Sequence, residues 1–326
     1  MRNALVLGAT GHIGNAVVRE LLHRGYQVSG VGRRPGGIGN LTGLPIRYIV
    51  GDYNQPGQID AWVPGHDVIV DAAAPIPLAI FNVFSREDQY AIAERRTDSL
   101  VQAAMRHGAS LCYVSSPSTF KRWSGTIDQW PGHLIRRLHP YFRMKDILEE
   151  RILLAARAGL RTTIVNPTWC FGPWDQRDRS LCLIPLLLTE EVPVTMSQIL
   201  NVIDVRDVAA AIVRAIEMER YSRPTLLSGY NIPANVLFSW ICELGGAKPP
   251  SFSIPSTIAA LGGIWIELIT RMLGQERGFR SLGPIMLSQH EFVPASRMLA
   301  ELGVGLRPFH ETLIDAIAWY RSVGYC

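Results

Sequence analysis

Short apolar runs alternate with amphipathic helical patterns along the first half of the chain. The runs are rich in valine, isoleucine and leucine, and such continuous runs between helices are typical of strands buried on both faces of a parallel sheet. The pattern therefore predicts a doubly wound α/β domain with a parallel sheet. The predicted strands lie within residues 3–8, 27–32, 46–52, 67–74, 110–116 and 161–167.

The pattern changes after Pro167. Residues 168–193 carry tryptophan, proline and charge without a clear period, as a substrate-facing loop region would. Residues 204–217 then predict a helix, and residues 225–230 predict one more strand of the main sheet. The chain is mainly helical in pattern from Asn231 onward. We therefore expect two interwoven lobes: residues 1–167 with about 200–230, and a smaller, mainly helical lobe of residues 168–199 and 231–326.

One predicted helix begins at Pro140 and ends at Gly159, and it carries a pair of titratable side chains near its start. Tyr141 and Lys145 are four residues apart, so they lie on the same face of the helix. An ammonium beside a phenol favours the phenolate and lowers the pKa of the tyrosine, which makes it a proton donor or acceptor near neutral pH. The alternative is a buried tyrosine and a solvent-facing lysine that share a register by chance.

A glycine-rich segment, GATGHIG at residues 8–14, connects the first predicted strand to the first predicted helix. Gly8, Gly11 and Gly14 allow a tight turn and let a pyrophosphate approach the helix N-terminus, where free N–H groups favour negative charge. The segment therefore predicts a dinucleotide-binding domain of the Rossmann type. The alternative is a tight turn without a ligand.

The end of the second predicted strand indicates which dinucleotide is bound. An acidic residue at this place holds the ribose diol of NAD, whereas an arginine accommodates the 2′-phosphate of NADP. The chain has Arg33 and Arg34 here and no acidic residue before Asp52. NADP(H) is therefore the favoured cofactor, with NAD(H) as the alternative, because guanidinium groups pair well with phosphate. Two surface arginines in a glycine- and proline-rich loop would explain the same residues.

Composition and charge exclude several other classes of protein. Of the 326 residues, 48% are hydrophobic and 18% are charged, which describes a folded protein and not a disordered one. The net charge of +4 is small for this length and comes from scattered residues, so it does not suggest nucleic acid as a partner. The five cysteines form no pattern with metal-ligand spacing, so no metal is expected. The chain enters a strand almost at once, which predicts a cytoplasmic protein without a signal peptide.

Residues 254–274 are long and apolar enough to need a membrane check. Glu267 and Arg271 interrupt the segment, so we predict a helix over a hydrophobic substrate cavity and no integral membrane span. Contact with a membrane surface is the alternative.

A cluster of hydroxyl groups follows the fifth predicted strand, in the sequence YVSSPSTF. Ser115, Ser116, Ser118 and Thr119 come at the carboxyl end of the sheet, where ligands bind in this type of fold. A hydroxyl group there can bond a substrate carbonyl and complement Tyr141. Serines that merely form a turn are the alternative.

Taken in order, the glycine-rich segment, the serine-containing strand end and YFRMK (141–145) resemble the extended short-chain dehydrogenases/reductases of the NAD-dependent epimerase/dehydratase superfamily. The resemblance covers nearly the whole chain. Residues 166–174 (NPTWCFGPW) resemble the R-P-x-x-x-x-G-P segment of that family, residues 201–217 its V-x-D-V-A-x-A helix, and residues 295–304 and 316–324 its C-terminal end.

The resemblance implies a role for each matching residue. Tyr141 would be the catalytic acid/base, Lys145 would lower its pKa and bind the nicotinamide ribose, and Ser116 would orient the carbonyl. Asp52 would contact adenine, while His12 fits better as a spacer in the loop than as a catalytic base. The full set of expected cofactor contacts is Gly8, Thr10, Gly11, His12, Ile13, Gly14, Arg33, Arg34, Asp52, Tyr53, Ala72, Ala73, Ala74, Lys145 and Pro167.

Within the family, YQVSGVGRRP and YVSSPSTF resemble the dihydroflavonol-reductase and 3β-hydroxysteroid-dehydrogenase-like branch. Four departures from the nucleotide-sugar branch point the same way: Ala93 replaces an asparagine, Arg96 a glycine, Asn166 an arginine and Trp169 an asparagine. They would remove polar groups near a diphosphate and favour a more apolar small-molecule substrate.

The sequence thus predicts an NADP(H)-dependent oxidoreductase, a ketoreductase that transfers hydride between the cofactor and a ketone or secondary alcohol. An epimerase or dehydratase that recycles its nucleotide internally is one alternative. A non-catalytic nucleotide-sensing regulator is another, although a sensor does not need the set Ser116, Tyr141 and Lys145. The resemblance also suggests a homodimer.

Overall fold

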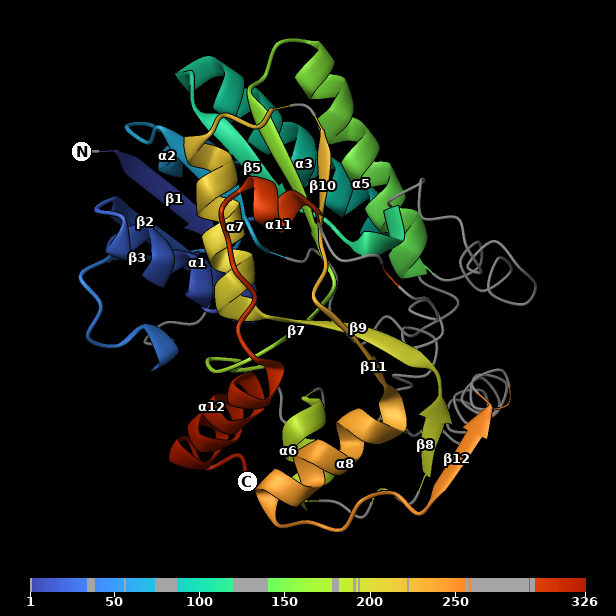
Figure 1. Cartoon of the computed structure of the whole chain (residues 1–326). Helices are drawn as coiled ribbons and strands as arrows, with labels where there is room; N and C mark the ends of the chain where they lie inside the picture. Colours follow the sequence, from blue (N-terminus) through green and yellow to red (C-terminus); the bar gives the residue numbers. More distant parts are fainter. Residues whose placement is uncertain are drawn as a thin grey trace.

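A seven-stranded parallel sheet forms the centre of the larger domain in this computed structural model (Figure 1). The strands are β1 (Asn3–Leu7), β2 (Gln27–Gly32), β3 (Arg47–Val50), β4 (Val68–Asp71), β5 (Ser110–Val114), β6 (Thr162–Pro167) and β10 (Pro224–Leu227). Their order is β10-β6-β5-β4-β1-β2-β3, and every neighbouring pair is parallel. The structure describes residues 2–33, 39–55, 57–73, 87–119, 140–177, 182–189, 192, 194–221, 223–255, 258, 293 and 297–326.

Both faces of the sheet are covered by helices, and β1 shows why its sequence is apolar throughout. Ala4 and Val6 pack into the core beneath α1 (His12–His23) and α7 (Val205–Glu217). Leu5 and Leu7 pack into the opposite core, beneath α3 (Glu87–His107) and α5 (Pro140–Arg157). Successive side chains of a strand point to opposite faces, so a strand buried on both sides cannot alternate apolar with polar residues. The doubly wound fold predicted from the sequence is confirmed.

The smaller lobe lies below this domain in Figure 1 and has its own hydrophobic core. Its helices α6 (Leu183–Thr189), α8 (Ala234–Gly245) and α12 (Phe309–Ser322) pack around side chains such as Phe171 and Leu237. Two small sheets lie apart from the seven-stranded sheet: β7 (Trp169–Phe171), β9 (Ile199–Asp204) and β11 (Tyr230–Pro233) form one, and β8 (Val194–Ser197) and β12 (Phe252–Pro255) form the other.

The stretch 168–193, which shows no period in the sequence, therefore contains both β7 and α6. The α6 sequence LIPLLLT is apolar at nearly every position, so no polar face marks it as a helix. The remaining short elements are α2 (Gln58–Trp62), α11 (Arg297–Glu301) and the 3₁₀ turns Gly39–Leu41 and Pro117–Thr119. Most of residues 254–274 lie outside the described part, and within the described part no helix has the length and apolarity to cross a membrane.

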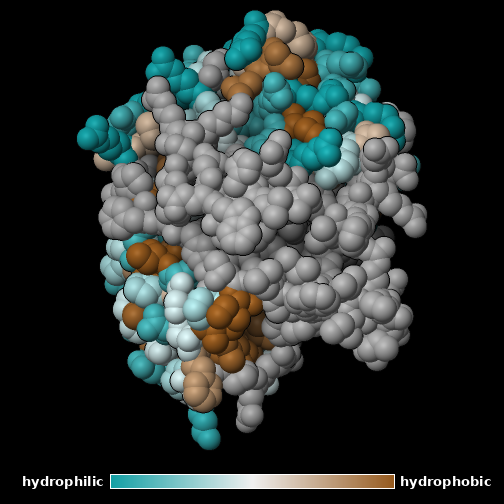
Figure 2. All heavy atoms as spheres, turned by 90° about the vertical axis from the view of Figure 1, so that its right-hand side faces the viewer, coloured by the Kyte–Doolittle hydropathy of each residue, from teal (hydrophilic) through white to brown (hydrophobic). Residues whose placement is uncertain are grey.

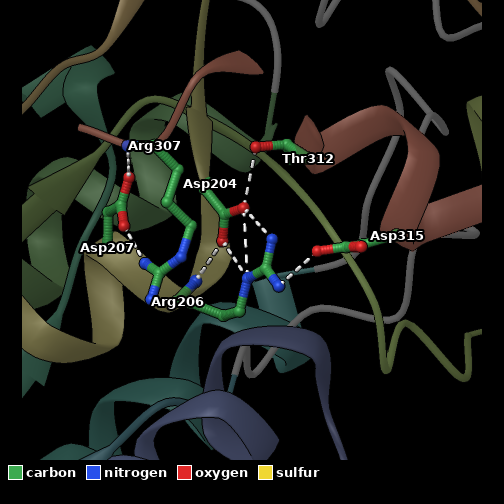
Figure 3. A network of polar contacts seen from close by, with 6 residues as sticks. All are labelled: Asp204, Arg206, Asp207, Arg307, Thr312 and Asp315. Carbon is green, nitrogen blue, oxygen red and sulfur yellow. Dashed lines mark hydrogen bonds and ion pairs between the residues drawn. The ribbon is translucent and has the colours of Figure 1, made fainter. Parts of the chain in front are cut away.

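Charged side chains connect α12 and the segment before it to α7 (Figure 3). Asp204 caps the N-terminus of α7 and accepts hydrogen bonds from the Arg206 backbone N–H (2.7 Å) and the Thr312 hydroxyl (2.8 Å). Arg206 also reaches Asp315 at 2.6 Å, and Asp207 pairs with Arg307. We call this group the lobe junction; its members are Asp204, Arg206, Asp207, Arg307, Thr312 and Asp315.

Hydrophobic residues are exposed on the smaller lobe. Figure 2 turns the β8–β12 side of the molecule toward the viewer, and a group of hydrophobic atoms lies in its lower part, where this lobe is. The upper part of the same view is mainly hydrophilic and contains smaller hydrophobic patches. Val194 and Phe252 of the two-stranded sheet are among the exposed apolar side chains of the protein.

Candidate active site

The strand register aligns the predicted site residues along one edge of the sheet. Leu7 lies opposite both Val31 and Asp71, and Asp71 lies opposite Tyr113. The segments that follow β1, β4 and β5 therefore leave the sheet side by side. This carboxyl edge is the place where ligands bind in open α/β sheets.

The glycine-rich loop fits closely against its neighbours. Gly8 has φ +75°, and a Cβ there would lie 2.9 Å from the Ala73 Cα atom. A Cβ on Gly14 would lie 2.1 Å from the Gly8 carbonyl oxygen. Only glycine lets the first turn of α1 approach the end of β1, and lets the end of β1 approach the segment after β4.

The N-terminus of α1 is open to an anion. Its N-cap is Gly11, which has no side chain that could accept a hydrogen bond from the first N–H groups, and no acidic residue lies in the first turn. The first N–H groups of a helix have no partner within the helix, and the helix dipole adds a partial positive charge there. A diphosphate fits this cradle chemically, because it would accept the hydrogen bonds that no capping side chain takes.

The other predicted cofactor contacts surround the same edge. Ala72 follows β4 and donates its N–H to Leu7 (3.1 Å), and Asn54 N–H donates to Asp52 (3.0 Å). Arg33 is exposed directly after β2, and Pro167 is the last residue of β6. Thr10 accepts a bond from Asn40 through its carbonyl, and Ile13 packs against the α1 core. Arg34 and Ala74 lie outside the described residues, so their predicted contacts stay predictions.

A buried ion pair that was not predicted from the sequence lies near the ends of β3 and β4. Arg96 on α3 and Asp71 at the end of β4 are 2.5 Å apart, and both side chains are shielded from solvent. Asp71 also accepts the Ala73 N–H (3.1 Å), and the Arg96 guanidinium lies 4.4 Å above the Tyr53 ring. Arg96, where the family has a glycine, therefore supplies a buried charge that pairs with Asp71 beside the segment after β4. The signal available in the sequence was an aspartate at the end of an otherwise apolar strand, at Asp71.

Lys145 lies on the buried face of α5. Its Nζ atom donates to the Val114 carbonyl (3.4 Å) and lies 5.6 Å from the centre of the Tyr113 ring. Burial lowers the pKa of Lys145 to about 8, with Arg96 acting in the same direction and Asp71 and Glu149 opposing it. Tyr141 belongs to the same helix, one turn earlier, and its side chain lies outside the described residues.

Ser116 lies at the end of β5 and its hydroxyl group has a fixed environment. The Ser116 Oγ atom accepts hydrogen bonds from the Ser118 hydroxyl (2.9 Å) and the Ser118 N–H (3.3 Å). A hydroxyl has one proton to donate and two lone pairs that accept. With both acceptor sites used by Ser118, the Ser116 proton is the part of the hydroxyl group left to donate a hydrogen bond.

A second group that the sequence did not predict is the carboxylate of Glu149. It is buried one helical turn after Lys145 and accepts hydrogen bonds from Ser115, Thr119 and Asn166. The spacing of Tyr141, Lys145 and Glu149 at intervals of four residues was the signal that could have found it.

His12 contacts the segment that follows β7. Its Nδ1 atom lies 3.9 Å from the Asp175 carboxylate, which Arg177 binds at two points (2.7 and 2.5 Å). Burial lowers the pKa of His12, while Asp175 opposes that shift. Burial alone would raise the pKa of Asp175, but Arg177 holds it well below its usual range. The imidazole thus lies beside Asp175, between the glycine-rich loop and the segment that follows β7.

The sequence profile of the NAD dependent epimerase/dehydratase family matches residues 4–231. The chain belongs to this family. Its members are extended short-chain dehydrogenase/reductase enzymes that use a nicotinamide dinucleotide, which confirms both the recognised family and the expectation of an enzyme. The residues of the glycine-rich loop, which carried the sequence argument, lie within the matched range.

Three comparisons cover nearly the whole chain. A putative dihydroflavonol 4-reductase of Synechocystis sp. is 29% identical over 98% of this chain and 95% of its own length. Sterol demethylase protein B of Methylococcus capsulatus is 27% identical, with 98% of each chain covered. The crystal structure of gox2253 is similar with a TM-score of 0.80 at 26% identity, covering 100% of this chain and 99% of its own.

Proposed function

We propose that the protein is an NADP(H)-dependent oxidoreductase that interconverts a ketone and a secondary alcohol. The main observation that supports this function is that the Lys145 ammonium and the Ser116 hydroxyl both lie near the end of β5. Lys145, buried on α5, bonds the Val114 carbonyl, and Ser116 follows two residues later with its proton free of protein acceptors among the described residues. Tyr141 precedes Lys145 by one turn of the same helix.

Each residue has a distinct part in the proposed reaction. The Ser116 hydroxyl donates a hydrogen bond to the substrate carbonyl oxygen and orients it. The bound cofactor supplies the hydride that the carbonyl carbon accepts. As negative charge develops on the oxygen, the Tyr141 phenol donates its proton there, and the nearby Lys145 cation stabilises the phenolate that remains. In the oxidative direction the same groups take the proton from the alcohol.

The glycine-rich loop and the arginines after β2 would hold the cofactor. The N-terminus of α1 suits the diphosphate. Gly8 and Gly14 must both remain glycine, because a Cβ at either position would contact neighbouring backbone atoms and change the shape of the loop. Arg33 is exposed next to this edge, with Arg34 following it in the sequence, so both are assigned to the 2′-phosphate of NADP.

An apolar substrate is the second part of the function we propose. Trp169 and Phe171 of β7 pack together (ring centroids 5.3 Å apart), and Phe171 contacts Phe309 of α12 (5.5 Å). Trp169 is only partly buried, so it offers aromatic surface beside the site. The relatives' names, a dihydroflavonol reductase and a sterol demethylase protein, support flat, largely apolar ketones.

The proposed division of labour follows the two lobes. Residues 1–167 with about 200–230 would bind the dinucleotide, and residues 168–199 with 231–326 would bind the substrate. We also propose that the protein is cytoplasmic and forms a homodimer. Light scattering of the purified protein tests the dimer.

The test of the reaction uses NADPH with three ketones: a dihydroflavonol, a 3-oxosteroid and an aliphatic 3-oxo ester. Tyr141→Phe should lower turnover by about 1000-fold, within the range for a lost general acid, and leave the NADPH dissociation constant within about twofold. Tyr221→Phe is the matched control, because Tyr221 lies in the loop before β10, at the opposite edge of the sheet. A Tyr141→Phe protein that keeps most of its turnover contradicts the proposed mechanism.

A paired titration tests the cofactor. NADPH should bind about tenfold more tightly than NADH, roughly 1.4 kcal/mol, and Arg33→Ala should reduce that preference. Tighter binding of NADH would overturn the assignment of the arginines and leave the rest of the proposed mechanism in place.

A further inference from the structure

The carboxylate of Glu149 joins three elements of the site. Its Oε2 atom accepts bonds from the hydroxyl groups of Ser115, after β5, and Thr119, in the following 3₁₀ turn (2.5 Å for Thr119). The side-chain amide of Asn166, near the end of β6, donates to the same oxygen at 2.9 Å. Glu149 itself belongs to α5, so one oxygen atom connects this helix to the ends of two neighbouring strands.

Asn166 also holds the backbone of Ser116, because its Nδ2 atom donates to the Ser116 carbonyl oxygen at 2.9 Å. Thr119 Oγ1 lies 2.8 Å from the same oxygen, and its single proton serves either that carbonyl or Glu149, while the Thr119 backbone N–H donates to the carbonyl at 3.2 Å. An amide group has two protons, so Asn166 can bond Glu149 and the Ser116 carbonyl at the same time. The position of Ser116 is thus connected to α5 through side chains and not only through the chain between them.

The location of Glu149 is costly for a residue with a merely structural role. All four members of this group are at least nine-tenths buried, and the buried neighbours of Glu149 on the helix are the apolar Leu148 and Ile152 together with Lys145 one turn earlier. An apolar side chain would pack there without the penalty of removing a carboxylate from water. What the carboxylate adds is a set of directed bonds to the turn that carries Ser116.

We propose that Glu149 is a positioning residue that acts through Thr119 and Asn166 to fix Ser116 relative to Tyr141 and Lys145. This role rests on the function proposed above, because it gives Glu149 a purpose only if the Ser116 hydroxyl orients the substrate. Glu149 touches neither the substrate nor the cofactor in this role. It sets the distance between the group that holds the carbonyl oxygen and the helix that delivers the proton.

A set of single variants separates positioning from stability. Glu149→Ala should lower kcat on the best ketone of the panel by about 30-fold, since small misplacements of orienting groups cost up to roughly 100-fold. The NADPH dissociation constant should stay within about twofold. Glu149→Gln keeps an oxygen that can accept the three bonds and should restore kcat to within about threefold of the wild type. Glu150→Gln, at the exposed neighbouring position, is the control without effect.

A double variant identifies the residue through which Glu149 acts. In a Ser116→Ala background, Glu149→Ala should change kcat by less than about twofold, because residues that act through one another are not additive. If the two losses multiply, Glu149 acts elsewhere and the proposal is wrong. If Ser116→Ala alone retains full turnover, the assignment of Ser116 in the proposed function fails instead.

Hydrogen exchange tests the positioning itself without any substrate. The Thr119 N–H bonds the Ser116 carbonyl (3.2 Å) and the Ser118 N–H bonds the Ser116 hydroxyl. These amides should exchange at least about tenfold faster in Glu149→Ala and at the wild-type rate in Glu150→Gln. Unchanged exchange in a folded Glu149→Ala protein overturns the inference. Should that variant fail to fold, Thr119→Val, which removes one of the bridging groups, must show the same faster exchange.

Discussion

The glycine-rich loop and the lobe junction both join separate segments of the chain, but the loop does so through backbone atoms and the junction through charged side chains. In the loop, positions are set by backbone atoms and by the absence of side chains: Gly14 leaves no room for a Cβ against the Gly8 carbonyl. At the lobe junction, charged side chains far apart in sequence meet, such as Asp207 and Arg307 (Figure 3). The first arrangement shapes the surface to which we assign the cofactor, whereas the second joins α7 to α12 and the segment before it.

This difference predicts whether a mutation mainly affects cofactor binding or mainly affects stability. A change in the loop should remove the proposed cofactor binding, because the backbone itself would be the binding group. A change at the lobe junction should lower the free energy of unfolding while leaving the cofactor surface in place. The predictions that follow test this separation.

Gly14→Ala should have the largest effect. A Cβ 2.1 Å from the Gly8 carbonyl forces the loop and the first turn of α1 apart. We expect the NADPH dissociation constant to rise by at least about 1000-fold, roughly 4 kcal/mol. Gly305→Ala is the control, because a Cβ at Gly305 meets no atom within 4 Å. A fluorescence titration that finds near-normal affinity for Gly14→Ala would contradict the backbone-cradle account.

Asp204→Ala should mainly lower stability. It removes the N-cap of α7, the partner of Arg206 and the acceptor for Thr312 at once. Breaking a buried charge pair from one side costs about 3 kcal/mol of the free energy of unfolding, which denaturant titration measures. NADPH affinity measured well below the midpoint should be unchanged.

The matched control for Asp204→Ala is Asp315→Asn. Asp315 bonds the same arginine, but its side chain is 48% exposed, so its loss should cost less than about 1 kcal/mol. Equal losses from the two variants would mean that burial does not set the strength of the lobe junction.

Thr312→Val should have a smaller effect of the same kind. The substitution keeps the volume of the side chain and removes the single hydrogen bond from α12 to Asp204. We expect a loss of about 1 kcal/mol in the free energy of unfolding. In an Asp204→Ala background the same substitution should cost almost nothing, and an undiminished cost there would show that the hydroxyl acts through another group.

The two aspartates of the lobe junction should respond to acid in opposite directions. Burial alone would raise the pKa of Asp204, but hydrogen bonds from Arg206 and Thr312 lower it below the ordinary value of 3.8. Its stabilising contribution is therefore present above pH 3.8 and is lost as the pH falls through its lower folded pKa. Burial raises the pKa of Asp207 despite Arg307, so its contribution is largest below pH 3.8 and is lost as the pH rises.

Denaturant midpoints between about pH 5 and pH 3 measure these opposing slopes. Asp204→Asn should flatten the loss of stability on acidification, and Asp207→Asn should steepen it. The same change of slope in both variants would contradict the assignment of opposite shifts.

Sequence reasoning reached the parts of the fold and site that depend on local pattern. Continuous apolar runs identified the strands, and the glycine spacing identified the loop, because both follow from backbone geometry that neighbouring residues determine. The spacing of Tyr141 and Lys145 likewise follows from the period of one helix. The α6 helix was missed because a helix that is apolar nearly all round has no polar face to reveal it.

The buried polar partners could not be predicted in the same way. Asp71 and Arg96 are 25 residues apart in sequence, and Glu149 meets Thr119 and Asn166 only once β5, β6 and α5 are packed. Their pairing depends on which strand neighbours which, and a pattern within one element does not contain that information. Arg96 was noticed as a departure from the family pattern, but its partner was not.

The most direct test follows the hydride. The protein is incubated with NADPH carrying deuterium at the transferable C4 position and with each of the three ketones. One deuterium on the new carbinol carbon for each NADPH consumed is the predicted result. Product that forms without net consumption of NADPH, or no consumption with any of the three ketones, would contradict the ketone reduction proposed for this site.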